Sequence, residues 1–241
     1  MKKIGLRITF KFFILLIPFF TYSQDEGLQN WYNLELDYDL TKKLKLSLEG
    51  SGRQSHDFYF FIGETPQNTQ KLFFDFNIKK KHNNFFGYSL GYRFILLNEM
   101  YDESNSLAYN VINNFSKKHR LYFDAYFNKK ITKKFKMCLR TRYQQQLSCE
   151  FADNYETIEI VDKLREKIKL EYFLNNSLVF STSIELFYLL EKDIEKIRYA
   201  TGFKKTFGKT SINFSYMIQH ELNNQPSDIL MALRTKLSYS I

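Results

Sequence analysis

The chain has 241 residues, of which 44% are hydrophobic and 18% aromatic, with 9 Gly, 3 Pro and 2 Cys. This composition excludes the collagen-like, low-complexity and disulfide-scaffold classes, and the length suffices for one sizeable domain. The 35 basic residues exceed the 26 acidic ones. They are scattered through every segment, whereas a nucleic-acid-binding chain gathers them on one face or arm. We therefore expect no nucleic-acid partner.

Residues 1–23 have the pattern of a secretory signal peptide. A positive start with two lysines and an arginine precedes an almost wholly apolar stretch at 8–20, and small residues stand at the junction. The apolar stretch is too short for a membrane-spanning helix, which needs about 20 residues. We expect cleavage after residue 23, which leaves a single mature domain of residues 24–241 and lowers the net charge from +9 to +5.

Apolar and polar residues alternate along most of the mature chain, which is the period of a β-strand with two unlike faces. From residue 32 to residue 40, apolar side chains hold the even positions and polar ones the odd positions. The pattern recurs eleven times, at residues 31–40, 44–48, 72–78, 86–96, 121–127, 135–143, 168–172, 178–188, 197–203, 212–218 and 231–241. We predict an all-β fold of about 10–12 strands.

The connections between these stretches alternate in length. Short ones with turn-forming or strongly polar residues lie near 41–43, 81–84, 132–134, 175–177 and 208–210, and longer or looser ones near 55–69, 98–118, 149–161, 191–194 and 223–227. Leu-Thr-Lys-Lys-Leu at 40–44 recurs as Ile-Thr-Lys-Lys-Phe at 131–135, which indicates two equivalent turns. These connections predict an up-and-down antiparallel sheet with tight turns at one end and loops at the other.

A β-sandwich, a soluble lipocalin-like barrel and a membrane barrel all produce such alternation. Here the apolar faces run for about nine to twelve residues, which crosses a bilayer when the strand is tilted. Aromatic residues stand near strand ends, where a membrane barrel has its girdles: Tyr32, Tyr38, Phe85, Phe86, Tyr143, Tyr172 and Tyr188. With the export signal, these features predict an antiparallel up-and-down transmembrane β-barrel in the cell outer membrane, surrounded by outer-membrane lipid.

The last strand indicates the same compartment. Leu233, Thr235, Leu237, Tyr239 and Ile241 occupy every second position up to the final residue. This pattern resembles the terminal strand that the barrel-assembly machinery recognises in bacterial outer-membrane proteins, although such strands usually end in an aromatic residue. We expect that machinery as a partner.

Four segments, at residues 31–36, 40–49, 119–123 and 184–188, resemble the domain-of-unknown-function family 2490 (DUF2490). Its members are predicted outer-membrane β-barrel proteins of Bacteroidota. The resemblance covers residues 28–241 and implies a fold and a location. It implies no functional residues, because the family has no established activity.

The strand count poses a problem of parity. Bacterial single-chain barrels have an even number of strands and both termini in the periplasm, whereas eleven strands put the two termini at opposite ends. Either the first strand does not span the barrel, or a further strand is hidden in a long loop, or residues 24–30 pass through the lumen.

If the apolar faces meet lipid, the polar faces line the interior, and these faces carry both signs of charge with a basic excess. The candidate lumen-lining residues are Arg93, Arg140, Arg142, Lys167, Lys169, Glu185, Arg198 and Arg234. One hypothesis is a charge-paired network that fills a narrow barrel, which would then be a structural or surface-binding barrel with a plugged lumen. The other is a small pore or pocket for small polar solutes with a preference for anions, in which Arg140 and Arg142 are the leading feature.

An outer-membrane lipid-modifying enzyme is the less favoured class. His56, His119 and His220 lie toward the loops, but a catalytic triad needs geometry that only the fold supplies. The chain has no phosphate-binding glycine loop, HExxH, EF-hand or CxxC spacing, so we expect no catalytic residues, metal or cofactor. Cys138 and Cys149 stand in and just beyond one extended stretch, and we expect two free thiols.

Overall fold

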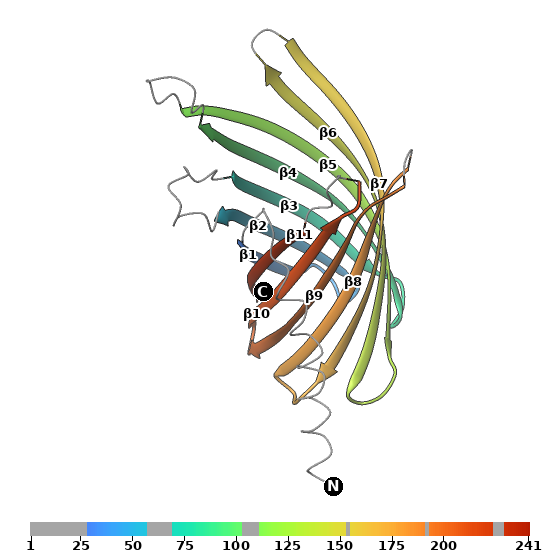
Figure 1. The fold of residues 1–241 in the computed structure, drawn as a ribbon. Coiled ribbons are helices and arrows are strands. Elements are labelled where there is room, and N and C mark those ends of the chain that lie inside the picture. Colours follow the sequence, from blue (N-terminus) through green and yellow to red (C-terminus); the bar gives the residue numbers. More distant parts are fainter. Residues whose placement is uncertain (1–27, 57–68, 103–110, 153–154, 191–192, 224–228) are drawn as a thin grey trace.

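The computed structural model describes residues 28–56, 69–102, 111–152, 155–190, 193–223 and 229–241. They form one closed barrel, in which consecutive strands are neighbours around the wall (Figure 1). The strands are β1 (Leu28–Asp39), β2 (Leu44–His56), β3 (Thr69–Lys81), β4 (Phe86–Asp102), β5 (Val111–Lys130), β6 (Phe135–Ala152), β7 (Tyr155–Phe173), β8 (Leu178–Leu189), β9 (Ile194–Phe207), β10 (Thr210–Glu221) and β11 (Ile229–Ser240). The all-β barrel prediction is confirmed. The expected signal peptide lies outside the described residues.

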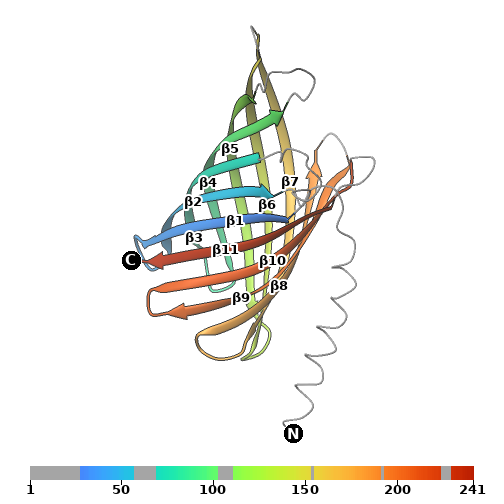
Figure 2. The ribbon, with the colours of Figure 1, turned by 60° about the vertical axis from the view of Figure 1, so that its left-hand side comes forward.

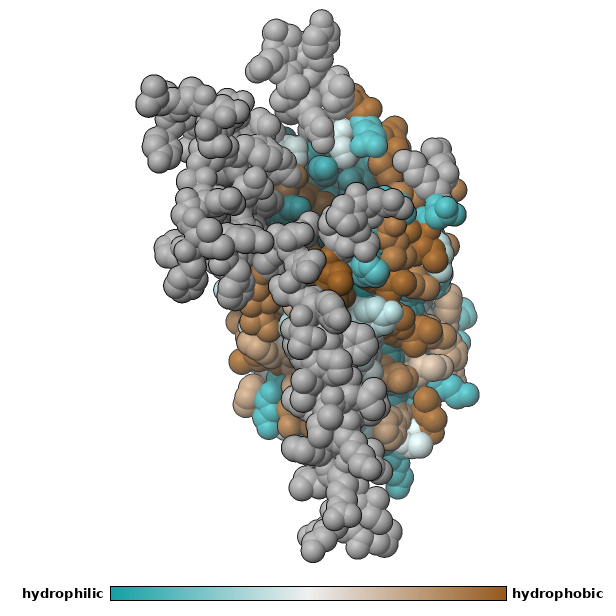
Figure 3. All heavy atoms as spheres, in the orientation of Figure 1, coloured by the Kyte–Doolittle hydropathy of each residue, from teal (hydrophilic) through white to brown (hydrophobic). Residues whose placement is uncertain are grey.

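The two faces of each strand separate as the alternation requires, but in the opposite sense to a soluble barrel. Large apolar side chains stand on the outside, where Leu34, Leu90 and Ile160 are each more than 60% exposed, and charged side chains point inward. Figure 3 shows apolar residues gathered over the visible wall between the grey atoms. A single closed sheet is not a sandwich, and a lipocalin-like barrel has its apolar side chains inside. Both soluble alternatives are therefore wrong.

Four of the five tight turns use the same local hydrogen bonds. The side chains of Thr41 and Thr132 each accept from the backbone N–H groups two and three residues later, at 3.0–3.2 Å. Asn83 and Asn175 do the same at 2.7–2.9 Å. The repeated pentapeptide therefore forms two equivalent turns, as predicted. The fifth turn relies on Gly208, whose φ of 58° lies in the left-handed region that favours glycine.

Two of the predicted loops are largely strand. β4 continues to Asp102 and β5 begins at Val111, so the connection is 103–110 rather than 98–118. β6 and β7 leave only residues 153–154 between them, whereas we expected a loop at 149–161. In both stretches like residues stand next to each other, two polar ones at 98–99 and at 113–114 and two apolar ones at 151–152, so the two-residue period is weak although the backbone stays paired. β6 and β7 consequently project far beyond β1–β3 at the loop end (Figures 1 and 2).

The barrel closes with an odd number of strands because its first and last strands are parallel. β1 pairs with β11 in register from Leu28↔Met231 to Asp37↔Ser240, and the other ten neighbouring pairs are antiparallel. The two strands lie side by side in Figure 2. The idea that the first strand does not span the barrel is wrong, and the closed order leaves no place in the wall for a hidden strand. Residues 24–27 lie outside the described part.

Cys138 and Cys149 both lie within β6, so the chain does not turn back between them. Cys138 is a free thiol. The side chain of Cys149 is outside the described part, and its predicted free state stays a prediction.

Candidate functional site: a basic cavity inside the barrel

A cavity of about 530 Å³ occupies the half of the interior nearer the tight turns. All eight candidate lumen-lining residues border it. Its basic lining residues are Arg53, Lys79, Arg93, Arg140, Arg142, Arg165, Lys167, Lys169, Arg198, Arg234 and Lys236. Its acidic lining residues are Glu35, Glu49, Asp75, Asp124 and Glu185. Among the residues that border the cavity, eleven cations therefore face five carboxylates.

One wall of the cavity is a fully buried hydrogen-bond network. Arg142 of β6 holds Asp124 of β5 through two bonds of 2.6 and 2.8 Å, and both side chains are 7% exposed. Ser89 donates to the same carboxylate at 3.1 Å, and the Asn77 amide donates to Ser89 at 3.3 Å. The two charges neutralise each other, and the one buried atom here without a hydrogen-bond partner, Asn77 Oδ1, is an acceptor that an anion cannot use.

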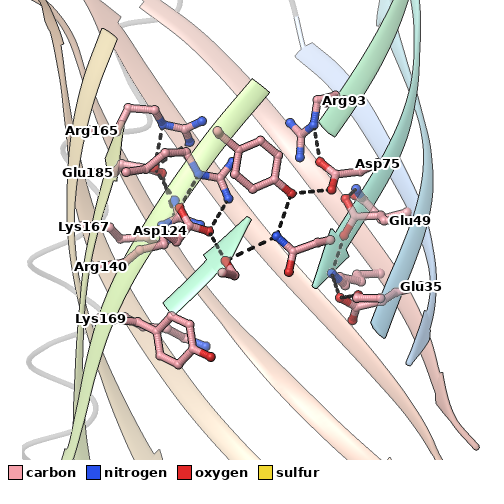
Figure 4. A pocket seen from close by; sticks show the side chains of 18 of the residues that line it. Glu35, Glu49, Asp75, Arg93, Asp124, Arg140, Arg165, Lys167, Lys169 and Glu185 are labelled. Carbon is pink, nitrogen blue, oxygen red and sulfur yellow. Dashed lines mark hydrogen bonds and ion pairs between the residues drawn. The ribbon is translucent and has the colours of Figure 1, made fainter. Parts of the chain in front are cut away.

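The network continues across β3 and β4 (Figure 4). Asn77 also donates to the hydroxyl of Tyr122, which donates to Asp75 at 2.5 Å. Arg93 binds the other oxygen of Asp75 at 2.5 Å. The result is an unbroken chain of contacts from Arg93 to Arg142 that ties four neighbouring strands together.

Beside this network, where β6, β7 and β8 are neighbours, Glu185 of β8 is shared by four cations. Arg140 and Arg165 lie 2.6 and 2.5 Å from Oε1, and both donate hydrogen bonds to it. The Lys167 ammonium and the Arg198 guanidinium lie 3.8 and 3.9 Å from Oε2, which are longer contacts without a hydrogen bond to that oxygen. Figure 4 shows Arg140, Arg165 and Lys167 converging on this carboxylate from β6 and β7. We call these five residues the Glu185 cluster.

The third group joins β1, β2 and β11 at the parallel seam, the place where β1 and β11 pair and close the barrel. Lys236 lies 2.5 Å from Glu49 and 3.1 Å from Glu35, and Asn33 donates to Glu49 at 2.9 Å. Arg234 donates to the Asn33 side-chain oxygen at 3.3 Å. Among the described residues, Arg234 has no carboxylate within salt-bridge distance, so its charge faces the cavity without a partner.

On the loop side of the cavity, aromatic rings and guanidinium groups stack on one another inside the barrel. The Arg53 guanidinium carbon lies 3.7 Å from the Trp31 ring centroid and 4.2 Å from that of Phe73. The guanidinium carbons of Arg165 and Arg198 lie 4.4 and 4.7 Å from the ring centroid of Phe187. The guanidinium carbon of Arg142 lies 3.7 Å from the ring centroid of Tyr122. Arg198 also lies over Trp31, at 5.4 Å from the ring centroid. We call these residues the belt: Trp31, Arg53, Phe73, Tyr122, Arg142, Arg165, Phe187 and Arg198.

The belt separates the cavity from the loop end. Its four rings are only 3–5% exposed, and no described lumen residue on the loop side of it, such as Arg120, Gln144 or Gln219, borders the cavity. Lining side chains become more exposed toward the turns, from 7% for Arg142 to 36% for Lys79. The cavity is therefore closed by the belt at one end and accessible from the turn end.

The sequence analysis missed the belt. Its aromatic residues occupy positions on the polar faces of their strands, as Phe73 does between Lys71 and Asp75. The signal that could have revealed the belt is an aromatic residue on the inward face of a strand with charged residues two positions before and after it.

Arg140 and Arg142, which we expected to act together, have separate surroundings. Arg142 is 7% exposed, donates from Nε and Nη2 to Asp124, and stacks on Tyr122. Arg140 is 28% exposed toward the cavity, and its buried Nε has no hydrogen-bond partner within the described structure. Of the two, Arg140 is therefore the one that a ligand in the cavity can reach.

The three histidines whose side chains the structure describes do not join this site. The side chain of His119 is on the outer face, where its Nδ1 is 2.6 Å from the Tyr92 hydroxyl, and neither His82 nor His220 borders the cavity. The side chain of His56 is outside the described part. Within the described residues no group of three or more potential metal ligands is found, and no helix there is long and apolar enough to cross a membrane.

The fold and its interior define the class of protein: a closed β-barrel with an apolar exterior and a charged lumen. The chain belongs to the family described as protein of unknown function (DUF2490), which it matches over residues 28–229. It is similar to the β domain of the Bordetella autotransporter BrkA, with a TM-score of 0.51 over 79% of this chain and 78% of that chain at 7% identity. At this identity the likeness shows the fold alone. No curated protein matches the chain.

Proposed function

We propose that this protein is an outer-membrane barrel that binds small anionic solutes in a cavity accessible from the turn end. The observation that carries the proposal is the imbalance of charge in the cavity, where eleven basic side chains face five acidic ones. Buried charges without partners are costly, so a lining with this excess stabilises an incoming anion. We propose a binding protein rather than an enzyme, without a cofactor.

The membrane assignment is supported by the outer surface. A continuous band of exposed Leu, Ile, Phe and Tyr surrounds the barrel, which in water would be a large apolar patch and in lipid is the ordinary exterior. The apolar start of the chain and the fold likeness to an autotransporter β domain agree with export and insertion. Insertion by the barrel-assembly machinery through β11 is part of the proposal.

The belt favours a pocket over an open pore. We expect wild-type protein inserted in a planar bilayer to produce no discrete conductance steps, because side chains fill the lumen at the belt. The double variant Phe73→Ala/Phe187→Ala lacks two belt rings, which should open the lumen at the belt. The basic lining should then make the current anion-selective. Phe74→Ala, which removes an outward ring next to Phe73, should stay silent. Wild-type steps would overturn the closed-pocket assignment.

Binding is tested through the only tryptophan in the chain, Trp31, which borders the cavity. We expect its emission to change saturably when phosphate is added to the refolded protein in detergent. Exchanging sodium for choline at constant phosphate should have no effect. Arg234→Met should weaken the response several-fold. An unresponsive Trp31 together with no heat of binding would contradict the proposal.

A structural or surface-binding barrel with a plugged lumen is the second candidate, and the buried network from Arg93 to Arg142 favours it. The charges of that network need no ligand, because Arg93 pairs with Asp75 and Arg142 pairs with Asp124. The two functions predict different results in the same titration, because a barrel whose interior is only structural binds no anion there.

A further inference from the structure

The Glu185 cluster has more positive charge than its carboxylate can neutralise. Four cations contact one carboxylate that is 3% exposed, and the shortest bonds all go to one of its oxygens. The cluster therefore has three positive charges in excess. Because guanidinium and ammonium groups away from water need counter-charges, this part of the cavity favours a ligand with more than one negative charge.

The cluster also has hydrogen-bond donors to spare. Lys167, which is 25% exposed, has no hydrogen-bond acceptor within the described structure, and its nearest carboxylate oxygen is 3.8 Å away. Arg140 is 28% exposed, and the one hydrogen bond of its guanidinium in the described structure runs from Nη2 to Glu185 at 2.6 Å. Arg165 is different, because Glu185 and Gln144 engage all three of its nitrogens. The available donors are therefore on Lys167 and Arg140, one beside the other on β7 and β6.

Arg234 adds a further cation from across the barrel. It borders the same cavity, has only the Asn33 oxygen as a hydrogen-bond partner, and lies close enough to Arg140 for their charges to interact. A halide ion can neutralise one of these charges, whereas an anion with several oxygens can accept from several donors at once. Guanidinium groups suit phosphate and carboxylate oxygens in particular.

We propose that the ligand of the cavity is a polyvalent oxyanion, bound by Lys167, Arg140 and Arg234 beside Glu185. This inference rests on the proposed function and names the class of solute. In this arrangement Glu185 is an internal competitor, since its carboxylate already occupies part of the positive field that the ligand enters. Arg165 holds that carboxylate in place with two hydrogen bonds to Oε1.

The test is isothermal titration calorimetry of refolded protein in detergent, with inorganic phosphate, citrate and chloride as probes at constant ionic strength. We expect phosphate or citrate to bind at least tenfold more tightly than chloride, and the comparison of the two oxyanions distinguishes a phosphate from a polycarboxylate ligand. Equal affinities for all three would overturn the polyvalent assignment but leave the anion-binding function standing. No binding by any of them would overturn both.

Variants locate the site. Lys167→Met should weaken phosphate binding at least tenfold, whereas Lys205→Met, on an outward position of β9, should leave it unchanged. Glu185→Gln removes the competitor and should tighten binding several-fold. If Glu185→Gln does not fold, the phosphate affinities of Lys167→Met and Lys205→Met still test the proposed site. Unchanged affinity in folded Lys167→Met would overturn the proposed site.

Discussion

Asp124 shows how strongly single residues are constrained inside this barrel. Its carboxylate accepts two bonds from Arg142 and one from Ser89, and all three residues are buried. Replacing a buried pair with apolar residues can be neutral, but removing one partner leaves a charge without compensation. The interior is therefore sensitive to changes that the outer face tolerates.

We expect Asp124→Asn to lower the free energy of unfolding by about 3–5 kcal/mol, the usual cost of breaking a buried ion pair. Guanidinium unfolding of the refolded protein in detergent measures this. Asp162→Asn is the matched control, because Asp162 lies on the outer face and accepts a single bond from Tyr143 at 3.1 Å. Its effect should stay within about 0.5 kcal/mol. Similar losses in both variants would show that Arg142 does not depend on Asp124.

At the scale of the strands, β4 must leave room for an aromatic side chain of β5. A Cβ on Gly91 would lie 2.1 Å from the Tyr122 ring, which is in the belt and donates to Asp75. Only glycine lets β4 and β5 keep this arrangement. The spacing of two strands is thus coupled to the closure of the lumen.

We expect Gly91→Ala to cost about 1–3 kcal/mol, as overpacking does, because Tyr122 must move away from Arg142 and Asp75. The same unfolding measurement applies, with planar-bilayer recording for leakage past the belt. Gly50→Ala is the control, since its Cβ would have no atom within 4 Å. A Gly91→Ala protein as stable as Gly50→Ala would contradict the close approach.

For the whole molecule, the parallel seam decides where the termini lie. Leu28 is opposite His56 and Met231 at the loop end, whereas Ser240 is opposite Asp37 at the turn end. The chain therefore enters the barrel at one end and leaves it at the other, which an even-stranded antiparallel barrel does not do.

The proposed outer-membrane location, with the loop end outside the cell, predicts that antibody reaches an epitope tag on intact cells when the tag stands between the predicted signal peptide and residue 28. A tag in the turn at 131–134 should be reached only after permeabilisation. Cell fractionation controls for outer-membrane insertion. Detecting both tags on the same side would contradict the topology.

The sequence by itself determined the strands, their two faces, the tight turns and the basic interior, because these depend on a two-residue period and on contacts within a few residues. The hydrogen bonds of Thr41 and Thr132 are of this local kind. It also placed Arg140 and Lys167 on lumen-facing positions. Where like residues stand next to each other, as Phe151 and Ala152 do, the period is interrupted and the ends of β6 and β7 were missed.

The tertiary structure alone decided the parallel closure, the belt and the partners of each charge. Arg140 and Arg142 are two residues apart and share a face, yet one shares Glu185 with three other cations and the other is engaged by Asp124. Trp31 meets Arg198 only because β1 closes on β11, nearly the full length of the chain away. Such contacts depend on the curvature and closure of the sheet, which no local period encodes.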